Sequence, residues 1–321
     1  MVGSIPSSHH KSESIGPFSS ISNSSFCCGL TLCFFLFATS NEHVAPDPGA
    51  HTSVPLAMQR TASKGTVQSP VCLVQGRARI VDDAAPLHYV GHWDGLGRAT
   101  LSNNGQSAVL TLSERPFRPF LVGGPLGSAY LFEQLHFHWG PDDAVGCEHL
   151  LDGRAHSMEA HLVHYNARYG SFGAALAHPD GLAVVALWLD GGGSAVWRPL
   201  QPIVRALRHI RRPGMRTTAL PADCLRWLAA GLELGRHYYT YDGSMTTAPY
   251  RECVRWLIYR TPVYVSPRQT AAFRRLLRRC NGRFAPITSN FRPVQRTTAG
   301  DDPPGLVFVR DSVGTARRAK L

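Results

Sequence analysis

The chain has 321 residues, of which 44% are hydrophobic and 17% charged, and its formal net charge is +11 at neutral pH. This composition excludes a disordered or fibrous protein, and the length is ample for a buried core in one large domain or two ordinary ones. No run reaches the roughly 18 apolar residues of a membrane-spanning helix, so we expect no membrane span in the folded part.

The first 65 residues read as two segments that precede the folded part. Residues 1–25 are rich in serine, and a hydrophobic run at 26–38 is followed by Thr39-Ser40, a pattern typical of a secretory signal. Residues 41–65 are rich in Pro, Ala, Ser and Thr and are interpreted as a linker. We therefore expect a leader at 1–40, a linker at 41–65, a folded domain at 66–310 and a basic tail at 311–321.

Short runs that alternate or carry β-branched residues recur within the folded part, separated by glycine and proline. They cover residues 108–112, 130–138, 160–164, 182–189 and 254–259. Helical spacing appears at 200–207, where Leu200, Ile203, Val204 and Leu207 share one face. The pattern predicts a sheet-rich α/β single domain without internal repeats.

A second helix is predicted over residues 266–280, where Pro267 suits a helix start. Its apolar positions are Phe273, Leu276, Leu277 and Cys280. The remaining positions carry Arg274, Arg275, Arg278 and Arg279. The net charge could indicate nucleic acid, a membrane surface or a glycosaminoglycan. We interpret these arginines as a solvated helix face, and without interleaved aromatic residues we expect no nucleic-acid partner.

Three histidines stand in a metal-ligand pattern. His136 and His138 are one residue apart, and His161 follows 23 residues after His138. Alternate residues of a strand point to the same face, so His136 and His138 can meet at one point and a neighbouring strand can add His161. Three imidazole nitrogens with an open fourth position are typical of a catalytic zinc site, so the expected cofactor is Zn²⁺.

Further motifs accompany these histidines in a fixed order between residues 66 and 310. They are Gln68-Ser69-Pro70, Asn103-Asn104-Gly105, Gly123-Gly124-Pro125-Leu126, the segment 134–139, Glu148-His149, Tyr239-Thr240-Tyr241, the segment 243–249 and Asn290-Phe291-Arg292-Pro293. In order and spacing the set resembles the alpha-class carbonic anhydrases. The resemblance implies a large, mostly antiparallel twisted β-sheet flanked by short helices, with the metal on its central strands.

The resemblance also implies the reaction, the reversible hydration of carbon dioxide to bicarbonate and a proton by zinc-bound hydroxide. It implies outer partners for the ligands, with Gln134 supporting His136, Glu159 supporting His161 and the backbone near Asn290 supporting His138. Glu148 and Thr246 are the implied catalytic residues, because the Thr246 hydroxyl would donate to Glu148 and orient the hydroxide. The implied carbon dioxide pocket consists of Val163, Val184, Met245, Thr247, Val254 and Trp256.

One position departs from the fast members of the family. They place a histidine after Asn-Asn-Gly to export the proton, whereas this chain has Gln106, which cannot titrate. We expect proton transfer to limit turnover and small imidazole-type buffers to restore part of it. We also expect a monomer that is inhibited by sulfonamides or anions at the zinc.

Two other functions compete with this one. A catalytically weak or silent member of the family could use its basic surface to bind acidic polysaccharide, but such relatives typically lack zinc histidines. A zinc hydrolase for another substrate would need a general acid, and none is visible. The compartment stays open between cytoplasmic, secreted through the segment 26–40, and peroxisomal through Ala319-Lys320-Leu321, a variant of the Ser-Lys-Leu address.

Overall fold

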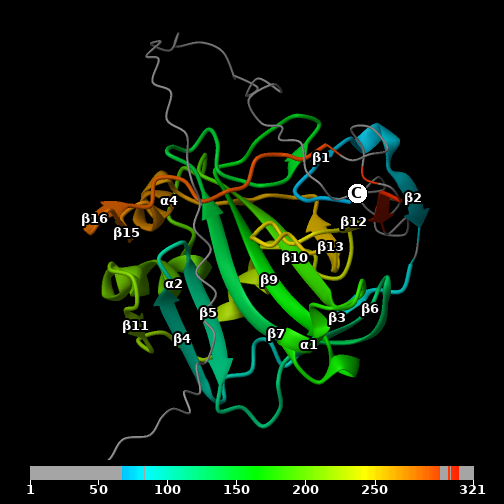
Figure 1. Ribbon diagram of the computed structural model, residues 1–321, viewed down its shortest axis with the longest axis horizontal. Helices are drawn as coiled ribbons and strands as arrows, with labels where there is room; N and C mark the ends of the chain where they lie inside the picture. Colours follow the sequence, from blue (N-terminus) through cyan, green and yellow to red (C-terminus); the bar gives the residue numbers. More distant parts are fainter. Residues whose placement is uncertain (1–66, 83, 297–302, 304, 311–321) are drawn as a thin grey trace, which may run out of the picture. The chain divides into compact units, whose positions relative to one another are not determined.

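The computed structural model describes residues 67–82, 84–296, 303 and 305–310 (Figure 1). These residues all fall in one compact unit of the chain. The predicted leader at 1–40, linker at 41–65 and tail at 311–321 lie outside the described residues. No helix among the residues described here is long and apolar enough to cross a membrane.

The described part consists mainly of strands. They are β1 Cys72–Leu73, β2 Arg79–Asp82, β3 Leu87–Val90, β4 Arg98–Asn103, β5 Ala108–Ser113, β6 Phe120–Gly123, β7 Leu126–Trp139, β8 Leu150–Leu151, β9 Met158–Asn166, β10 Leu182–Asp190, β11 Arg216–Thr217, β12 Tyr238–Gly243, β13 Val254–Tyr259, β14 Val263–Tyr264, β15 Leu277–Cys280, β16 Arg283–Pro286 and β17 Val307–Arg310. The α-helices are short: α1 Phe172–Ala175, α2 Gln201–Ala206, α3 Trp227–Gly231 and α4 Pro267–Phe273. Single 3₁₀ turns are η2 Gln75–Arg77, η3 Ala167–Tyr169, η4 Arg198–Leu200, η5 Leu207–Ile210 and η6 Cys224–Arg226.

One large mixed sheet dominates, with strand order β11-β4-β5-β7-β9-β10-β13-β12-β17-β2 and with β14, β3 and β6 attached beside this path. Its long central ladders, β7 with β9 and β9 with β10, are antiparallel. Within the described residues, the parallel ladders of this sheet are β10 with β13, β10 with β14 and β17 with β2. The predicted fold class, a sheet-dominated single domain with short flanking helices, is confirmed.

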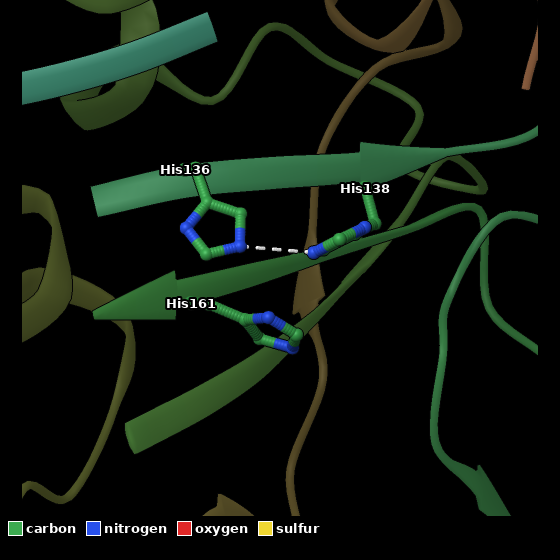
Figure 2. A group of neighbouring side chains, drawn as sticks. All are labelled: His136, His138 and His161. Atoms are coloured by element: carbon green, nitrogen blue, oxygen red, sulfur yellow. Dashed lines mark hydrogen bonds between the residues drawn. The ribbon is translucent and has the colours of Figure 1, made fainter. Parts of the chain in front are cut away.

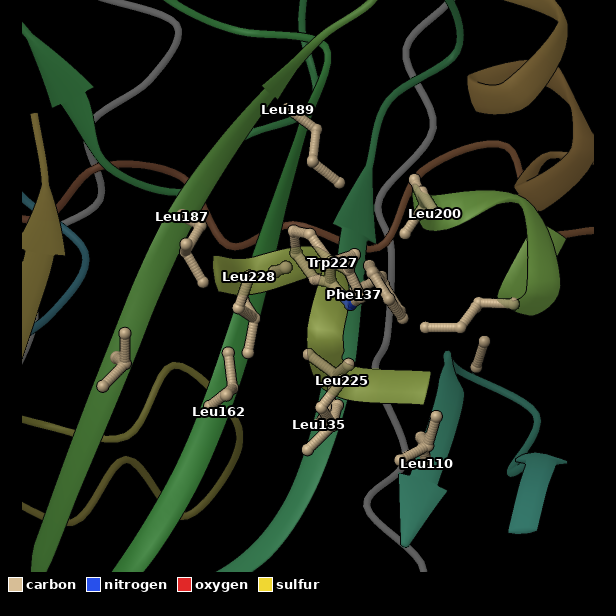
Figure 3. Packing of buried hydrophobic residues seen from close by; sticks show 14 of the residues in the cluster. Leu110, Leu135, Phe137, Leu162, Leu187, Leu189, Leu200, Leu225, Trp227 and Leu228 are labelled. Atoms are coloured by element: carbon tan, nitrogen blue, oxygen red, sulfur yellow. The ribbon is translucent and has the colours of Figure 1, made fainter. Parts of the chain in front are cut away.

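Alternation along the central strands creates two different faces. On β7, Leu135 and Phe137 are completely buried in one core cluster, where they pack with Leu162 and with Leu225 of η6 (Figure 3). His136 and His138 take the intervening positions and so point to the opposite face. Burying each large apolar side chain contributes about 1.5–3 kcal/mol, so the core fixes the strand register and thereby the direction of the histidines.

The strands predicted from sequence alternation are confirmed, and most are longer than predicted. The runs at 108–112, 130–138, 160–164 and 182–189 lie inside β5, β7, β9 and β10, and the run at 254–259 is β13. The helical spacing at 200–207 corresponds to η4, α2 and η5 in succession. The sequence pattern therefore locates the central residues of these elements, and packing in the folded core extends most of them at their ends.

The helix predicted over residues 266–280 was wrong in its second half. Helix α4 begins with a capping box between Ser266 and Gln269 and ends at Phe273. The chain then forms the hairpin of β15 and β16, joined by Asn281 and Gly282, which have φ of 47° and 76°. Asn-Gly is the preferred sequence for such a two-residue turn, and it overrides the helical spacing.

Candidate metal centre

The three histidines converge at the centre of the sheet. His136 of β7 lies opposite His161 of the antiparallel strand β9, and His138 lies two residues further along β7 (Figure 2). The Nε2 atoms of His136 and His138 are 3.0 Å apart. One nitrogen from each of the three rings lies within 4.8 Å of the others, and the cluster could hold a metal ion.

Each of these rings has its other nitrogen engaged by the protein. Nδ1 of His136 lies 3.0 Å from Gln134 Oε1, and Nδ1 of His138 lies 3.0 Å from the Asn290 carbonyl oxygen. Nε2 of His161 lies 2.7 Å from Glu159 Oε1. Because these oxygens accept, each ring donates its proton outward and leaves a lone pair for the shared point.

Burial keeps two of the rings in their neutral form. It is the largest cause that lowers the pKa of His136 well below its usual range, and the neighbouring His138 and His161 lower it further. Burial is also the main cause that lowers the pKa of His138. Neutral imidazole is the form that binds a metal, so the cluster is prepared for a cation at neutral pH.

Glu159 is fully buried but is satisfied by four N–H groups. Its Oε2 accepts from the backbone N–H groups of Glu148 and His149, each at 2.8 Å. Its Oε1 accepts from His161 Nε2 and from His149 Nδ1, each at 2.7 Å. Burial alone would raise the pKa of Glu159, but its contacts with His149 and His161 outweigh that effect and hold the pKa well below its usual range.

His149 belongs to this site, although the sequence assigned it no role beyond its place in the Glu148-His149 motif. Its Nε2 lies 2.7 Å from the Tyr241 hydroxyl, which lies 2.8 Å from Ser69 Oγ. The position of His149 directly after Glu148 in a family motif was the available signal. His149, Glu159 and His161 also form a group that could hold a metal, but their mutual hydrogen bonds already account for these atoms.

Glu148 presents a buried acceptor beside the histidines. Its Oε1 accepts from the Arg292 backbone N–H at 2.8 Å and lies 3.3 Å from His138 Nδ1. Its Oε2 lies 3.8 Å from His161 Nδ1 and has no hydrogen-bond partner. Thr246 is buried, and no hydrogen bond joins it to Glu148 in the described part of the chain. The site therefore contains an unsatisfied carboxylate oxygen where one more donor is required.

An apolar wall adjoins the cluster on the same face of the sheet. Val163 of β9, Val184 of β10 and Trp256 of β13 occupy one register row across three neighbouring strands. All three are buried, as is Val254, and the Trp256 ring centroid lies 4.9 Å from that of His161. Met245 and Thr247 are half-buried. Met245 packs against the hydrophobic core to which Val163, Val184 and Trp256 belong.

Gln106 lies in the exposed turn before β5. Its backbone N–H donates to Asn104 Oδ1 at 2.9 Å, and its carbonyl oxygen accepts from Asn290 Nδ2 at 2.9 Å. Asn290 also provides the carbonyl group that contacts His138. Asn290 thus links the Gln106 turn to the histidine cluster. The Gln106 side chain itself carries no titratable group.

The mixed sheet and the three-histidine cluster at its centre define the alpha carbonic anhydrase architecture. Residues 56–300 match the family model for eukaryotic-type carbonic anhydrase. Carbonic anhydrase 7 of Homo sapiens is 35% identical over 237 residues, which are 73% of this chain and 86% of that protein. Carbonic anhydrase 3 of Sus scrofa is 36% identical over 257 residues, covering 79% of this chain and 92% of that protein.

Carbonic anhydrase 5A, mitochondrial, of Rattus norvegicus is 36% identical over 235 residues, covering 72% of this chain and 74% of that protein. The chain therefore belongs to the eukaryotic-type carbonic anhydrase family and is an enzyme of that class. A silent binding module, the alternative considered from the sequence, is not favoured by these matches.

Proposed function

We propose that this enzyme catalyses the reversible hydration of carbon dioxide to bicarbonate and a proton, with one zinc ion held by His136, His138 and His161. The observation that carries the proposal is the convergence of three imidazole nitrogens within 4.8 Å, each ring held from behind by an oxygen acceptor. When bound, zinc would lower the pKa of a water ligand to about 7 and so supply a nucleophile at neutral pH.

Glu148 and Thr246 are proposed to orient the attacking oxygen. The unsatisfied Oε2 of Glu148 supports this role, since a nearby hydroxyl can donate to it. A threonine hydroxyl that donates to a carboxylate can only accept from a second group. Thr246 would then accept a hydrogen bond from the attacking oxygen, so that a lone pair of that oxygen faces carbon dioxide.

The wall formed by Val163, Val184 and Trp256 is proposed to receive carbon dioxide. The substrate is small and apolar, and buried valine and tryptophan side chains offer contact without competing hydrogen bonds. Val254, Met245 and Thr247 would complete this surface. Met245 stands where the family usually has leucine, a substitution of similar volume that costs little.

Proton export is proposed to depend on diffusing buffer. Gln106 is exposed at the position where fast relatives carry a histidine, and an amide cannot relay a proton at neutral pH. Each turnover releases one proton, so a buffer that enters the site must accept it.

The test is removal and return of the metal. Purified enzyme treated with a zinc chelator should lose carbon dioxide hydration and regain it with about one zinc per chain. An aromatic sulfonamide should inhibit the restored enzyme. Undiminished hydration in chelated protein shown to contain no zinc would reject the proposal.

A further inference from the structure

Two neighbouring segments of the chain carry many arginines and no acidic residues. Residues 201–222 and 266–296 contain no aspartate or glutamate. We define the arginine surface as the arginines of these segments near η5, β11 and the β15–β16 hairpin. Its members are Arg205, Arg208, Arg211, Arg212, Arg216, Arg275, Arg278, Arg279 and Arg283.

The two segments lie side by side at one edge of the domain (Figure 1). The Leu277 N–H donates to the Arg211 carbonyl oxygen at 2.8 Å. Asn103 Nδ2 donates to the carbonyl oxygens of both Arg211 and Leu277, at 3.1 and 3.0 Å. These hydrogen bonds to main-chain carbonyl oxygens join the two arginine-bearing segments into one surface.

The charge of this surface is not neutralised by the described residues. All its members are exposed except Arg278, which is half-buried, and none makes an ion pair with an acidic residue in the described part. Exposed arginines elsewhere do so, as in Arg98 with Glu114 at 3.1 Å and Arg226 with Asp223 at 3.1 Å. The arginine surface therefore produces a positive potential that favours an anionic partner.

Two large apolar side chains are exposed within this surface. Met215 is 42% exposed, and Phe284 is 45% exposed with the guanidinium groups of Arg212 and Arg279 at 5.2 and 5.5 Å from its ring centroid. Both side chains are presented by tight turns. The Met215 N–H donates to the Arg212 carbonyl oxygen, and Asn281-Gly282 joins β15 to β16. The surface is therefore preformed, which reduces the entropy lost on binding.

We propose that the arginine surface docks the enzyme onto membranes rich in anionic phospholipid. Arginine forks match phosphate groups, and exposed apolar side chains among cations can enter the headgroup region of a bilayer. A soluble polysaccharide would leave Met215 and Phe284 without a role. Stacking on a nucleic-acid base is disfavoured because guanidinium groups already contact the Phe284 ring.

The test is vesicle co-sedimentation of the full chain. Neutral phosphatidylcholine vesicles are compared with vesicles that contain roughly 30% phosphatidylserine. The variant Arg212→Gln/Arg279→Gln/Arg283→Gln is compared with Arg98→Gln/Arg154→Gln/Arg226→Gln, which loses the same charge at exposed sites elsewhere. Carbon dioxide hydration by each variant serves as the folding control, since none of these residues belongs to the metal centre.

The natural chain should bind anionic vesicles more tightly than neutral ones, and added salt should weaken that binding. The first variant should lose about fivefold in partition per arginine removed, and the second should lose much less. Phe284→Ser should weaken binding with the charges intact. Equal binding to both vesicle types, or equal losses in both triple variants, would overturn the proposal. Binding to polyglutamate, heparin or RNA but not to vesicles would also overturn it.

Discussion

Nε2 of His161 lies 2.7 Å from Oε1 of Glu159, and the same oxygen lies 2.7 Å from Nδ1 of His149. One buried carboxylate therefore fixes the proton of a candidate ligand and joins it to a wider network through Tyr241 and Ser69. Because its Oε2 also accepts from the Glu148 N–H, Glu159 connects the histidine cluster with the candidate catalytic carboxylate.

Glu159→Gln should weaken zinc binding about 10–100-fold, the usual effect of losing an outer partner of a ligand. The glutamine side chain carries no negative charge. Its NH₂ group would also face N–H groups that the Glu159 carboxylate accepts from in the natural protein, so donors would face donors. Zinc affinity is measured by competition with a chelator, with the exposed Glu114→Gln as control. Unchanged affinity in Glu159→Gln would mean that this contact does not tune the site.

Thr246→Ala should lower kcat/KM for carbon dioxide hydration about 10²–10³-fold while leaving zinc content unchanged. Glu148→Gln should give a similar loss, and the double variant should lose little more, because the two residues are proposed to act as a unit. Stopped-flow assays with metal analysis measure these effects. A loss below threefold in Thr246→Ala would remove the hydroxyl from the mechanism.

Gln106→His should raise turnover roughly tenfold or more in weak buffer, because an imidazole near working pH can carry the proton. In the natural enzyme, rising concentrations of imidazole should increase the rate until it levels off. A natural enzyme already at its maximal rate without buffer would show that proton export is not limiting.

We expect the stability of the fold to fall in acid because of His92 and His164. Their Nε2 atoms lie 3.0 Å apart in the core, and burial, the largest cause, lowers the pKa of His92 well below its usual range and that of His164 to about 3. The unfolded chain takes up these protons below about pH 6.5 and the folded chain does not. The contribution of these two neutral histidines to the free energy of unfolding is therefore complete above that pH and is lost as pH falls towards 3.

His164→Gln should reduce the pH dependence of the free energy of unfolding by up to about 1.4 kcal/mol per pH unit below pH 6.5. Urea unfolding of both proteins at pH 7.5 and 5.5 measures it. The two proteins differ only at residue 164, so the comparison isolates His164. The same pH dependence in both would contradict the assignment.

The sequence predicted the centre of this fold well because it is built from strong local patterns. Alternation placed β7, β9 and β10, and the spacing of His136, His138 and His161 predicted their shared face. The contact of His136 with Gln134, which the family resemblance implied, is compatible with the same period of two along the strand.

The remaining features depend on contacts between distant segments. His149 joins the site through Glu159, ten residues away, and Tyr241, 92 residues away, and Oε1 of Glu148 is held by the Arg292 N–H, 144 residues away. The helix prediction at 266–280 failed because it used helical spacing alone and overlooked the turn signal of Asn281-Gly282. That error also hid the arginine surface, since it assigned the arginines to a solvated helix.

The central claim is that His136, His138 and His161 hold the zinc that makes this protein a carbon dioxide hydratase. The most direct measurement is stopped-flow hydration with zinc quantified in the natural chain, in His161→Ala and in the control His178→Ala, whose ring stacks on Tyr169 outside the cluster. We predict about one zinc per chain and full activity in the natural protein and the control, with both lost in His161→Ala. Full zinc occupancy without hydration in the natural chain, or undiminished activity in His161→Ala, would contradict the account.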